Sequence, residues 1–229
     1  MSTKAVQEKS AEQVSFSQKI NDFLAKYRVV FVTVLIVLAV ALIGLFVFTA
    51  VKENNSKAAY ESVEDVLVQW EKARADTDKT GLSAKEDGFI ASLQKVAKSN
   101  KYSFGGARAY MTIAEIYFSR KDWKNALDQY LASVKAAPKA YTAGLSYFNA
   151  GICADELGNE DDAVKYFNQA VALDNFAMKP RAMFNIGRIE EQRSHTDVAI
   201  ALYEKIAEQF PDDQWTMLAK SRVIALKLK

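Results

Sequence analysis

The stretch Gly144–Ala170, GLSYFNAGICADELGNEDDAVKYFNQA, decides the fold. Small and aromatic residues recur in it at helical spacing, in two successive blocks. The first block contains Tyr147, Ala150 and Gly151, and the second contains Ala163, Phe167 and Ala170. Neither block alternates polar and apolar residues as a strand would, so the stretch predicts two helices.

The same pattern occurs once before this stretch and once after it. The earlier unit begins near Ala107 and the later one near Pro180. The marker alanines Ala126, Ala163 and Ala199 are 37 and 36 residues apart. The other markers are Tyr110, Ile113, Ala114, Tyr117, Tyr130 and Pro138 in the earlier unit, and Met183, Ile186, Gly187, Tyr203 and Pro211 in the later one. This period is close to that of a helix-turn-helix array, so we predict an all-α domain.

These residues resemble the tetratricopeptide repeat (TPR) pattern over about 107–211. The resemblance implies an α-solenoid of antiparallel hairpins, in which a small residue lets two helices approach and an aromatic residue packs behind it. The chain departs from the pattern where Asn175 replaces the closing proline of the middle unit. Tyr110, Tyr147 and Met183 also stand where the family has tryptophan. The alternative is a helical bundle without repeats.

Two flanking segments complete the predicted domain. Residues 52–106 are interpreted as a degenerate first hairpin, with helices at Ser56–Ala75 and Gly88–Lys98 joined by the polar segment Asp76–Asp87. Residues 212–229 are interpreted as a C-terminal capping helix, because the end of a solenoid needs a polar outer side.

An apolar run of 23 residues, Val29–Val51, contains no charged side chain. As a helix it would be ~34 Å long, slightly more than the hydrocarbon core of a bilayer. The run is too long for the core of a signal peptide, and Phe48 would occupy the −3 position if cleavage followed Ala50. We therefore predict one uncleaved transmembrane helix at 29–51.

Cations favour one orientation of this helix. The arm 1–28 contains five, against two in residues 52–71. Those of the arm are Lys4, Lys9, Lys19, Lys26 and Arg28. The excess predicts a cytoplasmic arm and a periplasmic domain on a cell inner membrane. An apolar stripe in the arm predicts either a short amphipathic helix on the membrane surface or an extension of the spanning helix. Its members are Ile20, Phe23, Leu24 and Tyr27.

Composition argues against several functional classes. Residues 52–229 contain 25 basic and 25 acidic residues, a balance that does not fit a nucleic-acid partner. Cys153 lies within a helical pattern and His195 within a polar turn, and neither has a catalytic or metal-ligating neighbourhood. With no glycine-rich phosphate loop, we expect no enzyme activity, cofactor, metal or small-molecule substrate.

The TPR resemblance implies a protein-binding groove lined by the first helix of each unit, at repeat positions 2, 5, 9 and 12. The predicted groove residues are Arg108, Met111, Phe118, Leu145, Phe148, Ile152, Arg181, Phe184 and Arg188. The carboxylates Glu115, Asp155 and Glu191 occupy the remaining positions. Such a groove suits an amphipathic helix or an extended apolar polypeptide segment. The alternative is that some of these side chains pack inside the domain.

The overall layout is similar to that of the ancillary single-pass TPR subunits of the bacterial general protein translocase. That likeness rests on Phe16–Arg28, on the apolar run and on Ala58-Ala59-Tyr60. It implies a periplasm-facing adaptor or chaperone-like accessory of protein translocation, with translocase subunits or periplasmic chaperones as partners. Two alternatives stay open: an envelope-assembly or cell-wall scaffold, and a TPR receptor that faces the cytoplasm.

Overall fold

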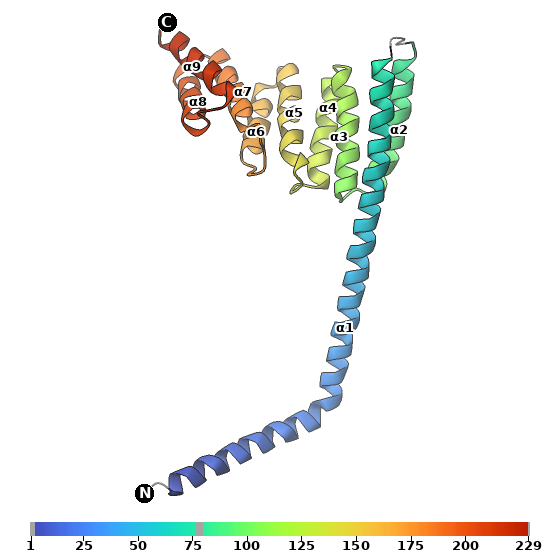
Figure 1. The fold of residues 1–229 in the computed structure, drawn as a ribbon, viewed down its shortest axis with the longest axis vertical. Helices are drawn as coiled ribbons and strands as arrows, with labels where there is room; N and C mark the ends of the chain where they lie inside the picture. Colours follow the sequence, from blue (N-terminus) through green and yellow to red (C-terminus); the bar gives the residue numbers. More distant parts are fainter. Residues whose placement is uncertain (1–2, 77–79, 229) are drawn as a thin grey trace. The chain divides into compact units, whose positions relative to one another are not determined.

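The computed structural model describes the backbone of residues 3–76 and 80–228, and the side chains from residue 18 onward except that of Lys19. Within these ranges the regular structure is entirely helical (Figure 1). The helices are α1 (Thr3–Ala75), α2 (Leu82–Ser99), α3 (Phe104–Ser119), α4 (Trp123–Ala136), α5 (Thr142–Glu156), α6 (Glu160–Val171), α7 (Lys179–Gln192), α8 (Thr196–Gln209) and α9 (Gln214–Lys227). This confirms the predicted all-α fold class.

The chain divides into two compact units, an N-terminal unit, Met1–Lys52, and a C-terminal unit, Glu53–Lys229. In the N-terminal unit the backbone is helical from Thr3 onward without a break. Residues 20–27 thus belong to the same helix as the apolar run, and their position at a membrane surface or within the membrane stays a prediction. The cations Lys4, Lys9 and Lys19 of the arm lie outside the described side chains.

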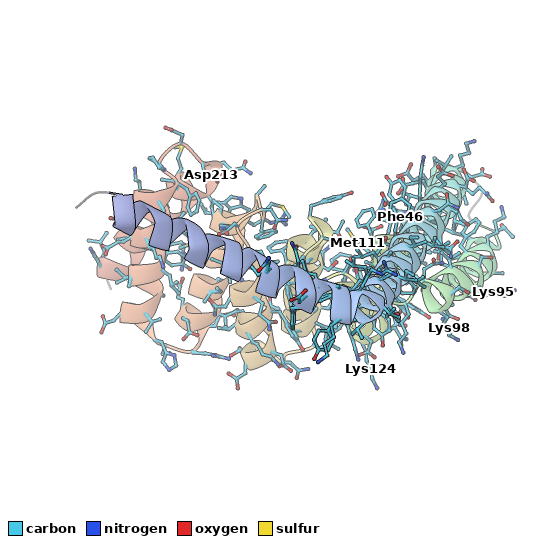
Figure 2. All side chains as sticks on the ribbon, turned by 90° about the horizontal axis from the view of Figure 1, so that it is seen from below. Phe46, Lys95, Lys98, Met111, Lys124 and Asp213 are labelled. Atoms are coloured by element: carbon cyan, nitrogen blue, oxygen red, sulfur yellow. The ribbon has the colours of Figure 1, made fainter. Side chains whose placement is uncertain are left out.

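Every residue of the apolar run is exposed in the N-terminal unit. Val29 is 73% exposed and Phe46, which is labelled in Figure 2, is 72% exposed. Among the described residues, only α1 is long and apolar enough to cross a membrane.

Helical hairpins follow one another along the C-terminal unit. The pairs α3–α4, α5–α6 and α7–α8 each pack as a hairpin, and α9 packs on α8 and α7 (Figure 1). Each hairpin turn contains one residue with positive φ, at Lys121 (59°), Gly158 (74°) and Ser194 (63°). These positions have the same spacing as the marker alanines. The left-handed residue ends the first helix of each pair and turns the chain into the second.

Small residues bring the paired helices together, as the repeat pattern implies. A Cβ atom built on Gly151 would lie 2.7 Å from the Phe167 ring, and one on Gly187 would lie 2.6 Å from the Tyr203 ring. Both rings are fully buried. Each aromatic residue of a second helix therefore packs against a glycine of the first helix.

Three hydrophobic clusters form the core of the C-terminal unit. The central cluster joins α3 to α7, and includes Met111, Tyr130, Phe148 and Phe167. A second cluster joins the end of α1 to α2 and α3, and a third joins α7, α8 and α9. The core is thus continuous along the array instead of concentrated in one centre.

The first hairpin differs from its prediction. Helix α2 begins at Leu82, six residues before the predicted start at Gly88, so much of the predicted polar connection is helical; residues 77–79 of it lie outside the description. The cause is the carboxylate of Glu86, which is 4% exposed. It accepts hydrogen bonds from the Trp70 indole (2.8 Å) and from Arg120 Nε (2.6 Å). A residue that reads as polar linker therefore ties α1, α2 and α3 together.

The outer sides of the two end helices are unlike each other. On α2 the exposed side chains include Lys95 and Lys98, which point away from the array (Figure 2). On α9, by contrast, Met217 is 79% exposed and Ile224 is 62% exposed, while Ala219 and Leu226 are buried. Lys220 and Ser221 of α9 are exposed as well, so α9 covers α8 and its outer side mixes polar and apolar side chains.

Candidate protein-binding face

The nine predicted groove residues all lie on α3, α5 and α7, the first helices of the three hairpins. They divide into two sets by exposure. Met111, Phe148 and Phe184 are 3%, 1% and 9% exposed. The other six are half-buried or exposed: Arg108, Phe118, Leu145, Ile152, Arg181 and Arg188. We call these six the first-helix face.

The buried set belongs to the core, which corrects the expectation that these side chains line an open groove. The Phe148 ring lies 5.6 Å from that of Phe167 and 5.9 Å from that of Phe176. The Phe184 ring lies 5.2 Å from those of both Tyr203 and Trp215. Rings from the second helices, the connections and α9 cover these positions, so the packing alternative holds for them and for Met111.

The middle of the first-helix face is apolar. Phe118 on α3 and Leu145 and Ile152 on α5 are half-buried, and each packs on the central cluster with part of its surface. Phe118 is fixed edge-on to the Trp123 ring at 5.0 Å. The central cluster thus fixes the positions of these side chains, and their outer atoms remain available to another polypeptide.

Ion pairs link successive first helices. Arg108 Nε on α3 lies 2.9 Å from Glu64 Oε1 on α1. Arg188 on α7 pairs with Asp155 on α5. At the end of the array, Arg222 Nε on α9 lies 3.2 Å from Glu191 Oε2 on α7. Pairs at such half-exposed positions contribute little stability, but they neutralise three of the arginines on this side of the array.

Arg181 is the exception among these arginines. Its side chain is exposed, and the structure gives it no carboxylate partner within 4.0 Å among the described residues. The guanidinium instead lies over two rings, 5.1 Å from the centroid of Phe148 and 5.6 Å from that of Trp215. Stacking of this kind fixes the plane of the guanidinium and leaves its N–H groups free to bind an acceptor.

A hollow of about 350 Å³ lies beside Arg188, between α7 and α9. It is lined by Phe184, Arg188, Glu191, Gln192, Tyr203 and Arg222. The Tyr203 hydroxyl donates to Glu191 Oε2 at 3.4 Å. Burial, together with the charge of Glu191, raises the pKa of Tyr203 to about 12, so the hydroxyl remains protonated at neutral pH. The polar groups that line the hollow therefore already have hydrogen-bond or ion-pair partners within the protein.

The other end of the face is acidic. The pKa of Glu115 is raised above its ordinary value, chiefly by burial. Arg108 opposes this rise, and the carboxylates of Glu64 and Glu71 add to it. Two carboxylates, those of Glu64 and Glu115, thus flank Arg108 at the α1–α3 end, and Glu71 acts on Glu115, whereas arginines collect at the α7–α9 end. A bound segment would meet opposite charges at its two ends.

Cys153 and His195, the residues considered for catalysis or metal binding, have structural roles. Cys153 is fully buried on α5, and burial raises the pKa of its thiol to about 12, so it is a poor nucleophile. His195 precedes α8, with Nδ1 2.7 Å from Glu190 Oε2. In the described part of the chain, no group of three His, Cys, Asp or Glu side chains is placed to hold a metal ion.

Sequence reasoning missed the contributions of α1 and α9 to this face. Glu64 lies on the degenerate hairpin, and Trp215 and Arg222 lie beyond the last aligned unit. Extending the repeat period past Pro211 would have identified α9 as a further first helix, with its side chains turned to the same side as those of α7.

Comparison with known families agrees with the repeat assignment. Residues 107–175 match one tetratricopeptide-repeat family model, and residues 148–214 match another. A TPR repeat-containing protein from Treponema pallidum is 37% identical over 150 residues, which cover 65% of this chain and 63% of that protein. Response regulator aspartate phosphatase J from Bacillus subtilis is 30% identical over 100 residues, which cover 41% of this chain and 26% of that protein. The chain thus spans less than two thirds of the length of both relatives.

Solved structures share the fold. MamA superposes with a TM-score of 0.51 at 18% identity, over 72% of this chain and 86% of MamA. The nearly identical TPR-like repeats of a kinesin light chain from Podospora anserina give a TM-score of 0.53 at 12% identity, over 72% of this chain and 85% of that one. At these identities the likeness concerns the solenoid alone.

Proposed function

We propose that this chain, which is a tetratricopeptide-repeat protein, is a membrane-tethered module that binds segments of other polypeptides on its first-helix face and performs no chemistry. The repeats form a protein–protein interaction module, and the observation that carries the binding proposal is the make-up of that face. Apolar side chains held from below by the core lie between an acidic end and an arginine-rich end. Amphipathic helices and extended apolar segments match such a surface.

The tether is supported by the exposure of the apolar run. The large apolar side chains from Val29 to Val51 lie on all sides of α1, and every one of them is exposed. So large an apolar surface would associate in water, whereas in a bilayer it would be solvated by lipid. The helical backbone also satisfies its own hydrogen bonds, as the hydrocarbon core requires.

The setting we propose is the periplasmic side of an inner membrane, where the domain serves as an accessory of protein translocation. The positive charge of the arm supports the orientation, and the layout of anchor and repeats supports the setting. In spheroplasts treated with protease from outside, we expect residues 52–229 to be degraded while the arm stays protected. Survival of 52–229 would instead indicate a receptor that faces the cytoplasm.

Charge reversal on the first-helix face tests the binding proposal. After mild detergent extraction, Arg181→Glu is expected to lower the recovery of co-purifying partners at least about tenfold, since arginines are frequent among the residues that dominate interface energies. The matched control is Lys124→Glu, which reverses another exposed cation, on α4 (Figure 2). Equal recovery from the two variants would contradict the assigned face.

The identity of the recovered proteins tests the setting separately. Translocase subunits or periplasmic chaperones are the expected partners. Cell-wall enzymes or outer-membrane assembly factors would instead indicate an envelope-assembly scaffold, with the binding face unchanged.

A further inference from the structure

Four aromatic side chains, two exposed and two half-buried, collect at one end of the hairpins in the C-terminal unit. Tyr102, in the connection before α3, is 60% exposed, and Tyr141, just before α5, is 66% exposed. The rings of Tyr60 on α1 and Phe104 stack at 5.6 Å, and those of Phe104 and Tyr141 lie 5.5 Å apart. These four residues form what we call the aromatic edge. It lies outside the first-helix face and plays no part in the binding proposed above.

Lysines accompany the rings. Lys98, Lys101 and Lys139 are all exposed at this edge, and Lys101 Nζ lies 5.3 Å from the centroid of the Tyr102 ring. No ion pair joins any of the three to a carboxylate among the residues that the structure describes. The edge therefore carries net positive charge beside exposed rings.

The composition of the edge favours lipid over protein as its partner. Tyrosine is common at both kinds of interface, but lysine is depleted from protein–protein interfaces. At a membrane surface, tyrosine rings lie at the headgroup level, and lysine reaches the phosphates with its long stem. An anionic leaflet attracts such lysines over about one Debye length.

The chain connects this edge closely to the apolar run. The Gly105 N–H donates to Ser56 Oγ at 3.0 Å, and Tyr60 stacks on Phe104. Ser56 follows the last residue of the run, Val51, by only five positions. The aromatic edge is thus built on the part of the C-terminal unit that follows the run most directly.

The hairpin turns at the other end of these helices have a different character. Asp122 caps α4, and the Asp161 side chain is 99% exposed at the start of α6. Because Asp161 is paired with Arg193, the contrast between the two ends lies in the rings: among the described residues, these turns carry no exposed Phe, Tyr or Trp side chain. The two ends of the hairpins therefore differ in their expected affinity for lipid.

We propose that the aromatic edge binds anionic phospholipid headgroups, with Lys101 and Lys139 on the phosphates and Tyr102 and Tyr141 at the headgroup level. This surface would hold the C-terminal unit against the bilayer by one end of its hairpins and leave the opposite turns in water. The inference rests on the tether of the proposed function, because the run must lie in the same membrane.

A spin label at the edge tests the contact in the full chain reconstituted into nanodiscs. The labelled variant is Ser99→Cys, at the end of α2, and the matched control is Ser119→Cys, at the end of the antiparallel helix α3. Both serines are exposed helix ends, and the native Cys153 is fully buried, so the parent chain gives the labelling blank. Collision with oxygen reports lipid contact, and collision with a water-soluble nickel chelate reports exposure to water.

In discs that contain phosphatidylglycerol, the label at 99 is expected to gain oxygen collisions and lose nickel collisions relative to phosphatidylcholine discs, while the label at 119 does not change. Replacing both Lys101 and Lys139 by glutamine should lower the equilibrium constant for the lipid contact roughly twenty-five-fold, at about fivefold per lysine. Equal water exposure at 99 and 119 in both discs would overturn the lipid contact and leave the tether intact. A chain that does not enter the discs would overturn the tether itself. A change at 99 that requires a co-purified protein would assign the edge to a protein partner, against the proposal.

Discussion

Phe148→Glu is expected to abolish cooperative unfolding of the C-terminal unit. The ring is 1% exposed and lies against Phe167 and Phe176 in the cluster that joins α3 to α7. Loss of the ring alone costs about 3–5 kcal/mol, as for other buried phenylalanines. The carboxylate adds the cost of an unpaired buried charge. The sum is comparable with the whole stability of a typical domain, about 5–15 kcal/mol.

Tryptophan fluorescence during urea titration of the detergent-solubilised chain is the appropriate measurement. The three tryptophans, Trp70, Trp123 and Trp215, all lie in the C-terminal unit, so the signal does not report on the N-terminal unit. The control is Asn168→Glu, which places the same charge at an exposed position of α6 and should change stability by no more than about 0.5 kcal/mol. If Phe148→Glu unfolded in a sigmoidal transition with a midpoint close to that of the parent chain, the Phe148 ring would lie on the open surface and not in the core.

Gly106→Ala is expected to destabilise the junction of α2 and α3 by at least about 3 kcal/mol. A Cβ atom at this position would lie 2.0 Å from the backbone oxygen of Asn100 and 2.7 Å from its carbonyl carbon. Neither atom belongs to a flexible side chain, so relief requires movement of the connection itself. Overpacking ordinarily costs about 1–3 kcal/mol, and a clash with backbone belongs at or above the top of that range.

Gly88→Ala is the matched control for this change. Gly88 lies within α2, and no atom comes within 4 Å of the added Cβ position. Alanine there should stabilise the unit by about 0.5–1 kcal/mol, because glycine is a poor helix former. The two glycine variants should therefore shift the urea midpoint in opposite directions, and Trp70, which packs in the cluster of α1, α2 and α3, is one of the reporters. Equal midpoints would mean that the α2–α3 connection is not rigid.

The hairpins could be predicted from the sequence because each rests on contacts between nearby residues. Gly151 contacts Phe167 and Gly187 contacts Tyr203 across a single turn, so the contact recurs with the same period as the marker residues in the sequence. Helical periodicity, small residues and proline positions carry that information within about forty residues.

The exposure of the predicted face could not be read in this way. Whether Phe184 lies open depends on Trp215, which comes from a helix outside the aligned units. The early start of α2 likewise depends on Glu86 meeting Arg120, 34 residues further along the chain. Polar and aromatic residues are ambiguous until their distant partners are known, since the same side chain can face solvent or complete a buried network.

Photo-crosslinking from the first-helix face within washed membranes tests the central claim most directly, since it requires both the tether and the binding face. A photoreactive amino acid in place of Ile152 on α5 is compared with one in place of Asn168 on α6, an exposed position outside the face. After carbonate washing, we predict adducts with other polypeptides from position 152 and none from 168, all in the membrane pellet. Release of the chain into the supernatant, or equal adducts from the two positions, would contradict the account.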